Sequence, residues 1–158
     1  MTAPRILIAD DDRFLAAALA IRCRGLGLQV QTAHDARTAL NMLFESPPEI
    51  ACLDVNMPCG NGLSVCEMVS GDSRFAGTAL IVLTGNADPQ TILRCHSLCA
   101  YYVPKCVDLW SRIGPLLIEL LHLPVDTSLE AVSKPRGEGD SPHFSPKAMQ
   151  NGDSPRRF

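Results

Sequence analysis

The stretch Ile50–Pro58, IACLDVNMP, sets the plan of the fold. Four apolar residues lead into Asp54, and a loop-forming Asn-Met-Pro follows. A short apolar run bounded by turn residues predicts a buried strand, so Asp54 is expected at the carboxyl end of that strand. In an open α/β sheet this edge is where ligands bind. The Asp54 carboxylate is therefore a candidate functional group.

A second strand signal, Ile6–Ala9, ends in the same way, in Asp10-Asp11-Asp12. If the two strands are neighbours, several carboxylates converge at one edge. Such a cluster does not stay ionised without a compensating cation. Two carboxylates, a backbone carbonyl and waters suit Mg²⁺ or Mn²⁺, which prefer oxygen ligands. The sequence therefore predicts a hard divalent metal at this edge.

Strand and helix signals alternate five times along the chain, which predicts a parallel sheet covered by helices on both faces. The first helix has an apolar stripe at i, i+3, i+4 and i+7, formed by Phe14, Ala17, Ala18 and Ile21. The last helix is expected over residues 108–122. Pro115 lies inside it and predicts either a kink or a late start.

The composition suits a globular domain followed by a polar tail. Of 158 residues, 46% are hydrophobic, and the formal net charge is −3. This balance favours neither nucleic acid nor an anionic membrane as a partner. The N-terminus has too short an apolar run for a signal peptide, and no later run spans a bilayer. We expect a cytoplasmic protein with a domain over 1–123 and a disordered Pro/Ser/Gly-rich tail over 124–158.

Seven cysteines raise the question of a disulfide or zinc framework. The sequence contains no CxxC motif, and Cys52 lies within an apolar strand. Cys95, His96 and Cys99 follow helical spacing, which favours reduced thiols in a core. The alternative is a zinc site formed by these three residues with Cys106 as a fourth ligand.

Two further residues follow strand signals at the same edge. Thr84 follows the strand over residues 79–83, and Lys105 follows the strand at 102–103. A hydroxyl and an ammonium supply donors for phosphate oxygens. One aspartate could then act as a nucleophile toward a phosphoryl group and form an acyl phosphate.

The motifs ILIADDD, LDVNMP with Gly62 following, LTG and YVPK together resemble the receiver domain of two-component response regulators. The resemblance covers residues 5–123. It implies a flavodoxin-like, doubly wound (βα)5 fold with a five-stranded parallel sheet in the order 2-1-3-4-5. It also implies a phosphoacceptor switch rather than an enzyme.

The resemblance assigns the acidic residues their roles. Asp54 would accept phosphate from a sensor histidine kinase, a histidine phosphotransfer protein or a small phosphodonor. Asp11 would bind Mg²⁺ directly and Asp10 through water, with Asp54 and the Asn56 backbone carbonyl completing the protein ligands. Asp12 lies one past the usual acidic pair, and a helix N-cap is its expected role.

The switch residues also come from the resemblance. Thr84 would hydrogen-bond the phosphoryl group and Lys105 would pair with it. Tyr102 occupies the switch-aromatic position, whose ring turns inward as Thr84 moves; the alternative is a half-buried strand aromatic. The changed surface would bind a downstream protein or a second copy, with no direct nucleic-acid contact.

Three departures from the family pattern fall on the face of the fourth helix, fifth strand and fifth helix. Cys106 follows Lys105 where the family has proline after a cis bond, so a trans bond is expected here. Ser97 and Leu98 stand where the family has a small residue and a glycine. The fourth helix must therefore end in a different way. Pro115 is the third departure.

Two other functions remain open on sequence grounds. Asp10 and Asp12 also resemble the nucleophile and acid/base of haloacid-dehalogenase-type phosphohydrolases, although no second acidic motif lies between Lys105 and Leu123. The other alternative is a receiver that has lost phosphorylation and serves as a constitutive binding module. Since no effector domain follows Leu123, a single-domain regulator is expected.

Overall fold

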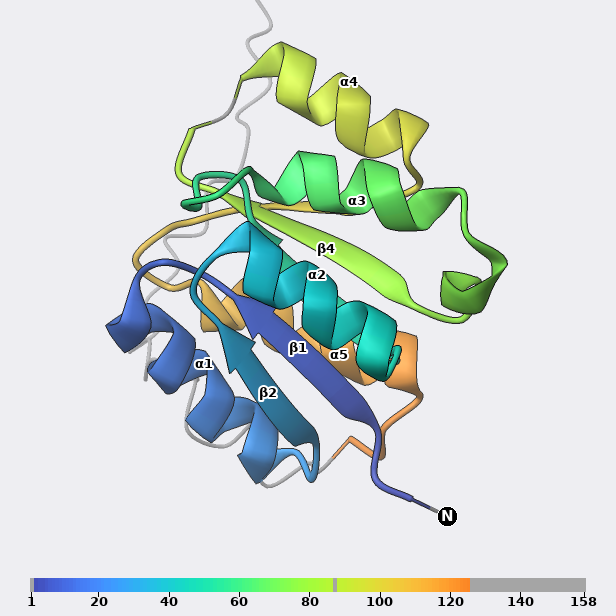
Figure 1. The fold of residues 1–158 in the computed structure, drawn as a ribbon. Helices are drawn as coiled ribbons and strands as arrows, with labels where there is room; N and C mark the ends of the chain where they lie inside the picture. Colours follow the sequence, from blue (N-terminus) through green and yellow to red (C-terminus); the bar gives the residue numbers. More distant parts are fainter. Residues whose placement is uncertain (1, 87, 126–158) are drawn as a thin grey trace, which may run out of the picture. The chain divides into compact units, whose positions relative to one another are not determined.

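The computed structural model describes residues 2–86 and 88–125. Five parallel strands form one sheet in the order β2-β1-β3-β4-β5, which confirms the order implied by the resemblance (Figure 1). The strands are β1 (Arg5–Ala9), β2 (Gln29–Ala33), β3 (Ile50–Asp54), β4 (Ala79–Thr84) and β5 (Tyr101–Pro104). The helices are α1 (Arg13–Gly25), α2 (Ala36–Glu45), α3 (Gly62–Ser70), the 3-10 turn η1 (Ser73–Phe75), α4 (Pro89–Ser97) and α5 (Trp110–Leu121).

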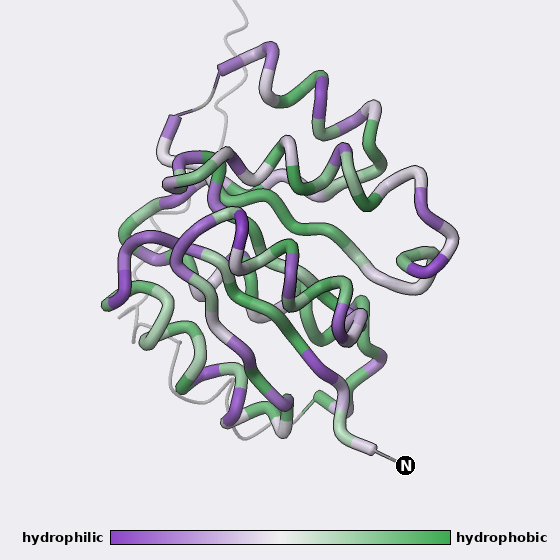
Figure 2. The backbone as a smooth tube through the Cα atoms, viewed as in Figure 1, coloured by the Kyte–Doolittle hydropathy of each residue, from purple (hydrophilic) through white to green (hydrophobic). Residues whose placement is uncertain are grey.

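Helices cover both faces of the sheet. One core joins α1 and α5 to alternate strand residues such as Ile8 and Ile81. The other core joins α2, α3 and α4 to the intervening residues, such as Leu53 and Val82. Every residue of β3 is buried, as expected for a central strand with both faces covered. Figure 2 shows the matching hydrophobic run along β4.

The register brings the strand ends to one edge. Asp54 pairs with Leu83 of β4, and Thr84 pairs with Pro104 of β5. Asp10 directly follows β1 and donates its backbone N–H to Ala33 O at 3.0 Å. β5 is the edge strand, a position that tolerates the missing N–H of Pro104.

The stripe predicted for α1 is wrong about which face is buried. Phe14 and Ile21 are 91% and 69% exposed. The buried face is instead formed by Ala16, Leu19, Ala20 and Cys23. Because α1 is apolar almost all round, two stripes fit the helical period, and periodicity alone does not choose between them. The helix thus keeps one apolar face against the sheet and presents another outward.

Helix α5 contains Pro115 in its interior and begins at Trp110. A start delayed to the proline is therefore wrong, while the predicted kink stays a prediction. Pro115 and Ser111, one turn earlier, are both exposed. Because proline has no N–H, the Ser111 carbonyl receives no helix hydrogen bond from residue 115. This carbonyl therefore lies where water can reach it.

The end of α4 shows how the helix stops without the family's glycine. Leu98 keeps a negative φ of −92°, and the left-handed conformation falls one residue later, on Cys99, at φ +52°. Cys99 is exposed. A non-glycine residue pays about 1 kcal/mol or more for this conformation.

We expect Cys99→Gly to raise the free energy of unfolding by about 1 kcal/mol, because glycine adopts the left-handed conformation without a Cβ clash. Urea denaturation measures the change. The matched control is Ser97→Gly at the last residue of α4, which should lower stability. A destabilised Cys99→Gly variant would contradict the prediction.

The predicted tail lies outside the described residues, apart from Pro124 and Val125, which are exposed. Over residues 2–86 and 88–125, no helix is long and apolar enough to cross a membrane.

Candidate functional site

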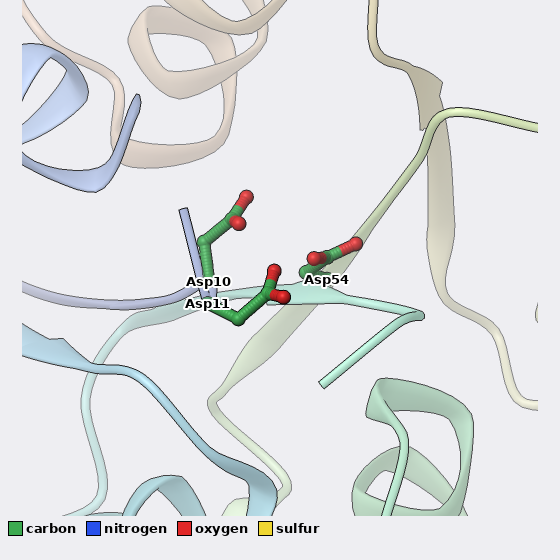
Figure 3. Close-up of side chains that lie close together, drawn as sticks. All are labelled: Asp10, Asp11 and Asp54. Atoms are coloured by element: carbon green, nitrogen blue, oxygen red, sulfur yellow. The ribbon is translucent and has the colours of Figure 1, made fainter. Parts of the chain in front are cut away.

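Three carboxylates lie together at the carboxyl edge of the sheet (Figure 3). Asp10 and Asp11 follow β1, and Asp54 ends β3. One oxygen from each lies within 4.8 Å of the others. Asp10 is fully buried and Asp54 is 2% exposed, whereas Asp11 is exposed. The neighbouring strands β1 and β3 thus concentrate negative charge at one point, as the sequence predicted.

Lys105 supplies the opposite charge. Its Nζ lies 2.7 Å from Asp10 Oδ2 and 3.1 Å from Asp54 Oδ2. Its backbone N–H donates to Thr84 O at 2.7 Å, which holds the start of the loop after β5 against β4. The structure has no cis peptide among its described residues, so the expected trans Lys105-Cys106 bond is confirmed, and the lysine still reaches both carboxylates.

The electrostatics of the cluster are unbalanced. Burial, followed by the charge of Asp10, raises the pKa of Asp54 to about 6, although Lys105 opposes the shift. For Lys105, burial acts to lower the pKa, but the two carboxylates outweigh it and the pKa is raised. The single ammonium therefore does not compensate both buried carboxylates fully.

These residues fit a hard divalent cation. Asp10 Oδ2 is buried and, apart from its ion pair with Lys105, has no well-aligned hydrogen bond to a described residue. Asp11 adds a carboxylate open to solvent. The donors are all oxygens, which suits Mg²⁺ or Mn²⁺. Asn56 is held close by, since its N–H donates to Asp54 Oδ1 at 3.3 Å.

The other predicted site residues lie beside this cluster. Thr84 is 2% exposed, and its hydroxyl donates to Asn86 O at 2.8 Å and accepts from Asn86 N–H at 3.1 Å. Tyr102 is half-buried against the core under α4. The Tyr102 hydroxyl is buried and has no hydrogen-bond partner within the described chain. Among the described residues, the Thr84 hydroxyl is thus hydrogen-bonded and the Tyr102 hydroxyl is not.

Gly62 fixes the position of α3 against Asp54. A Cβ at residue 62 would lie 2.3 Å from the Asp54 carbonyl oxygen and 3.2 Å from Leu53 Cβ. The N–H of Gly62 donates to Val55 O at 3.3 Å. Only glycine allows the helix to begin this close to the end of β3.

His34 lies beside the site and is not among the residues predicted from the sequence. It follows β2, and its Nδ1 lies 2.9 Å from the Asp10 carbonyl oxygen. Because a carbonyl only accepts hydrogen bonds, Nδ1 carries the proton in this contact. The available signal was its place after a strand at the same edge as Asp10.

Two alternative sites lose support. The Asp12 carboxylate accepts the N–H groups of Phe14 and Leu15, which confirms its predicted role as the N-cap of α1 and leaves it engaged there. In the described ranges, the only cluster of potential metal ligands is the aspartate group, so the predicted zinc ligands do not gather. Of these, Cys95 is buried, whereas His96, Cys99 and Cys106 are exposed.

The sequence pattern of the response regulator receiver domain matches residues 6–110. The chain belongs to this family. Receiver domains act as phosphoacceptor switches, and the acidic cluster with Lys105 occupies the edge where such a switch is expected. The fold, the strand order and the family membership therefore agree.

Relatives and solved structures support this assignment. The DNA-binding response regulator MtrA of Mycobacterium tuberculosis is 37% identical over 102 residues, which span 64% of this chain and 43% of MtrA. The HemR receiver domain of Leptospira biflexa is 28% identical with a TM-score of 0.68, covering 77% of this chain and 97% of HemR's. TrrA of Thermotoga maritima, solved with Mg²⁺ and BeF, is 24% identical with a TM-score of 0.65, covering 74% and 98%.

This receiver domain chain spans less than half the length of MtrA. DNA binding is a property of that longer relative. The expectations that this chain contacts no nucleic acid and acts as a single domain therefore stay predictions.

Proposed function

We propose that this chain is a response regulator in which Asp54 accepts a phosphoryl group from phosphohistidine on a kinase or phosphotransfer protein. The observation that carries the proposal is the contact of a buried Asp54 with Lys105, beside Asp10 and Asp11. An ammonium at 3.1 Å from the nucleophile suits a reaction that brings further negative charge to this point.

The group transfer forms one bond and breaks one. An Asp54 carboxylate oxygen attacks phosphorus, the O–P bond forms, and the N–P electron pair stays with the imidazole nitrogen of the donor. With a pKa of about 6, Asp54 is mostly ionised at pH 7 and can act as the nucleophile. Lys105 stabilises the oxygens of the transferred group.

Asp10, Asp11 and Asp54, with the Asn56 carbonyl, would hold Mg²⁺ or Mn²⁺, which neutralises charge on the transferring phosphoryl group. The excess of carboxylates over ammonium groups supports this part of the proposal. Asp10, which is fully buried, would act on the metal through water; it also contacts Lys105 Nζ at 2.7 Å and accepts the Asp12 N–H at 2.9 Å.

Phosphorylation would change the loop after β4 by exchanging hydrogen bonds. The Thr84 hydroxyl, now donating to Asn86 O, would turn toward the phosphoryl oxygens. Asn86 O would then lose its donor, while the Tyr102 hydroxyl lacks a partner in the described chain. Movement of these groups would alter the face of α4, β5 and α5, the surface proposed to bind a downstream protein or a second copy.

The outward face of α1 is the surface that we propose for docking of the phosphodonor. It begins within a few residues of Asp10 and Asp11, and its apolar residues are Phe14, Ala17, Ala18 and Ile21. Val107, in the loop after Lys105, is also fully exposed. Apolar side chains beside an acceptor suit a partner that covers the pocket during transfer.

We expect Phe14→Ser to slow phosphoryl transfer from a kinase at least tenfold, because a central exposed aromatic contributes strongly to an interface. Its reaction with acetyl phosphate, which needs no docking, should be unchanged. A panel of kinases is screened, and the one that phosphorylates the wild type fastest serves as the donor. Leu93→Ser on α4, which replaces another exposed apolar side chain, is the control. Equal slowing with both donors would contradict a docking role.

The proposal is tested by intact-mass analysis after incubation with acetyl phosphate, with and without Mg²⁺. We expect one phosphoryl adduct that requires Mg²⁺ and disappears in Asp54→Asn. Asp12→Asn is the control and should keep the adduct. Loss of the adduct in Asp10→Asn together with its retention in Asp54→Asn would indicate a phosphohydrolase-type nucleophile. No adduct in the wild type would favour the phosphorylation-impaired binding module.

A further inference from the structure

A groove lies between α2 and α3, on the side of the loop after β3. Its volume is about 360 Å³, which falls within the range of small-molecule sites, roughly 300–1,000 Å³. The lining residues come from α2, from the loop and from α3: Ala36, Arg37, Leu40, Cys59, Gly60, Asn61, Ser64, Val65 and Met68. The phosphoacceptor proposal uses none of these side chains.

The loop backbone keeps the groove open. Cys59 and Gly60 both have positive φ, at +60° and +117°, and the N–H of Ala36 donates to Pro58 O at 3.1 Å. A Cβ at residue 60 would lie 3.3 Å from Ala36 Cβ, so a larger residue would fill this end of the groove. The space therefore depends on a glycine.

The walls of the groove are apolar. Val65 is buried, and Leu40 is half-buried. Met68 is 58% exposed and offers an unbranched thioether that adapts to the shape of a ligand. An apolar body of modest size would cover these side chains.

The polar groups of the groove favour an anion. Arg37 is exposed and forms no ion pair with any described residue. Asn61 Oδ1 accepts the Ser64 N–H at 2.8 Å, while its amide nitrogen has no hydrogen bond to a described residue and can donate to a ligand. No acidic residue lines the groove; the nearest, Asp35, caps α2 through Thr38, and its charge acts on Arg37 from outside the groove.

We propose that this groove binds a small carboxylic acid with an apolar body. The carboxylate pairs with Arg37 and accepts from the Asn61 amide, while the apolar body packs against Leu40, Val65 and Met68. This site is separate from the acidic cluster, which would repel the same ligand.

The test is an amide NMR titration of the full chain with 4-phenylbutyrate as the probe. We expect saturable shifts at residues 36–40 and 59–68 with a millimolar Kd, as suits a ligand of this size. Arg37→Gln should weaken binding about threefold, and the neutral analogue 4-phenyl-1-butanol should bind the wild type about threefold more weakly. The matched control Arg112→Gln on α5 should leave the Kd unchanged.

Two blocking variants keep the proposal falsifiable. Ser64→Phe fills the groove, and Met68→Glu places a carboxylate on its exposed rim without touching the core. Both should abolish the shifts. No saturable shift at the groove in the wild type, or equal binding by both blocked variants, would overturn the proposal. If the same residues shift when the protein is concentrated without probe, the occupant is a second copy of the chain. That result would also overturn the proposal.

Discussion

Gly62→Ala is expected to destabilise the receiver domain by about 3 kcal/mol and to cut phosphoryl acceptance sharply. An added Cβ would lie 2.3 Å from the Asp54 carbonyl oxygen, a backbone atom at the end of a fully buried strand. Neither β3 nor α3 can move without disturbing the packing of the other. Overpacking of this kind costs roughly 1–3 kcal/mol or more. The acceptor carboxylate would move with its backbone.

Urea denaturation and the acetyl phosphate adduct measure the two effects of this substitution. Gly71→Ala is the matched control, because Gly71 ends the same helix with a negative φ, and a Cβ added there would meet no atom within 4 Å. The prediction fails if Gly62→Ala is as stable and as readily phosphorylated as Gly71→Ala.

Lys105→Met is expected to destabilise the cation-free protein by about 3 kcal/mol at pH 8, since it leaves two buried carboxylates without their ammonium. The loss should fade toward pH 5. The folded-state pKa of Asp54, about 6, already exceeds the ordinary value of 3.8, so the folded form binds protons more readily and stability falls as the pH rises between these values. Removing Lys105 raises that pKa further.

Urea unfolding at pH 5 and pH 8, with EDTA or with Mg²⁺, separates these contributions. Mg²⁺ should restore part of the lost stability at pH 8, because it compensates the same carboxylates. Lys105→Arg, which keeps the positive charge, is the control. An equal loss at both pH values would show that the lysine acts through packing rather than charge.

The site could be predicted from the sequence because it depends on strand ends. The main candidate residues lie at or directly after strand ends, and parallel strands bring their carboxyl ends to one edge whatever the details of packing. Asp10, Asp54, Thr84 and Lys105 therefore lie where the pattern places them. Their chemical roles stay predictions until the adduct is measured.

Other features depend on choices that periodicity does not make. The faces of α1 are both apolar, so only packing against the sheet decides that Leu19 is buried and Phe14 is exposed. The left-handed turn at Cys99 was not foreseen, because cysteine carries no conformational signal for it. His34 was missed because a single histidine after a strand is often an ordinary surface residue with no role in a site.

Helix α1 has one apolar face against the sheet and a second one exposed to water, and the exposed face affects how the protein behaves in solution. A side chain as large as Phe14, held almost wholly in water beside Ile21, adds to the apolar surface through which concentrated molecules adhere. Such adhesion is driven by water release and strengthens on warming from the cold, unlike contacts between charges. Solubility would then depend on temperature and on whether a partner is present, and salt that screens charges would not restore it.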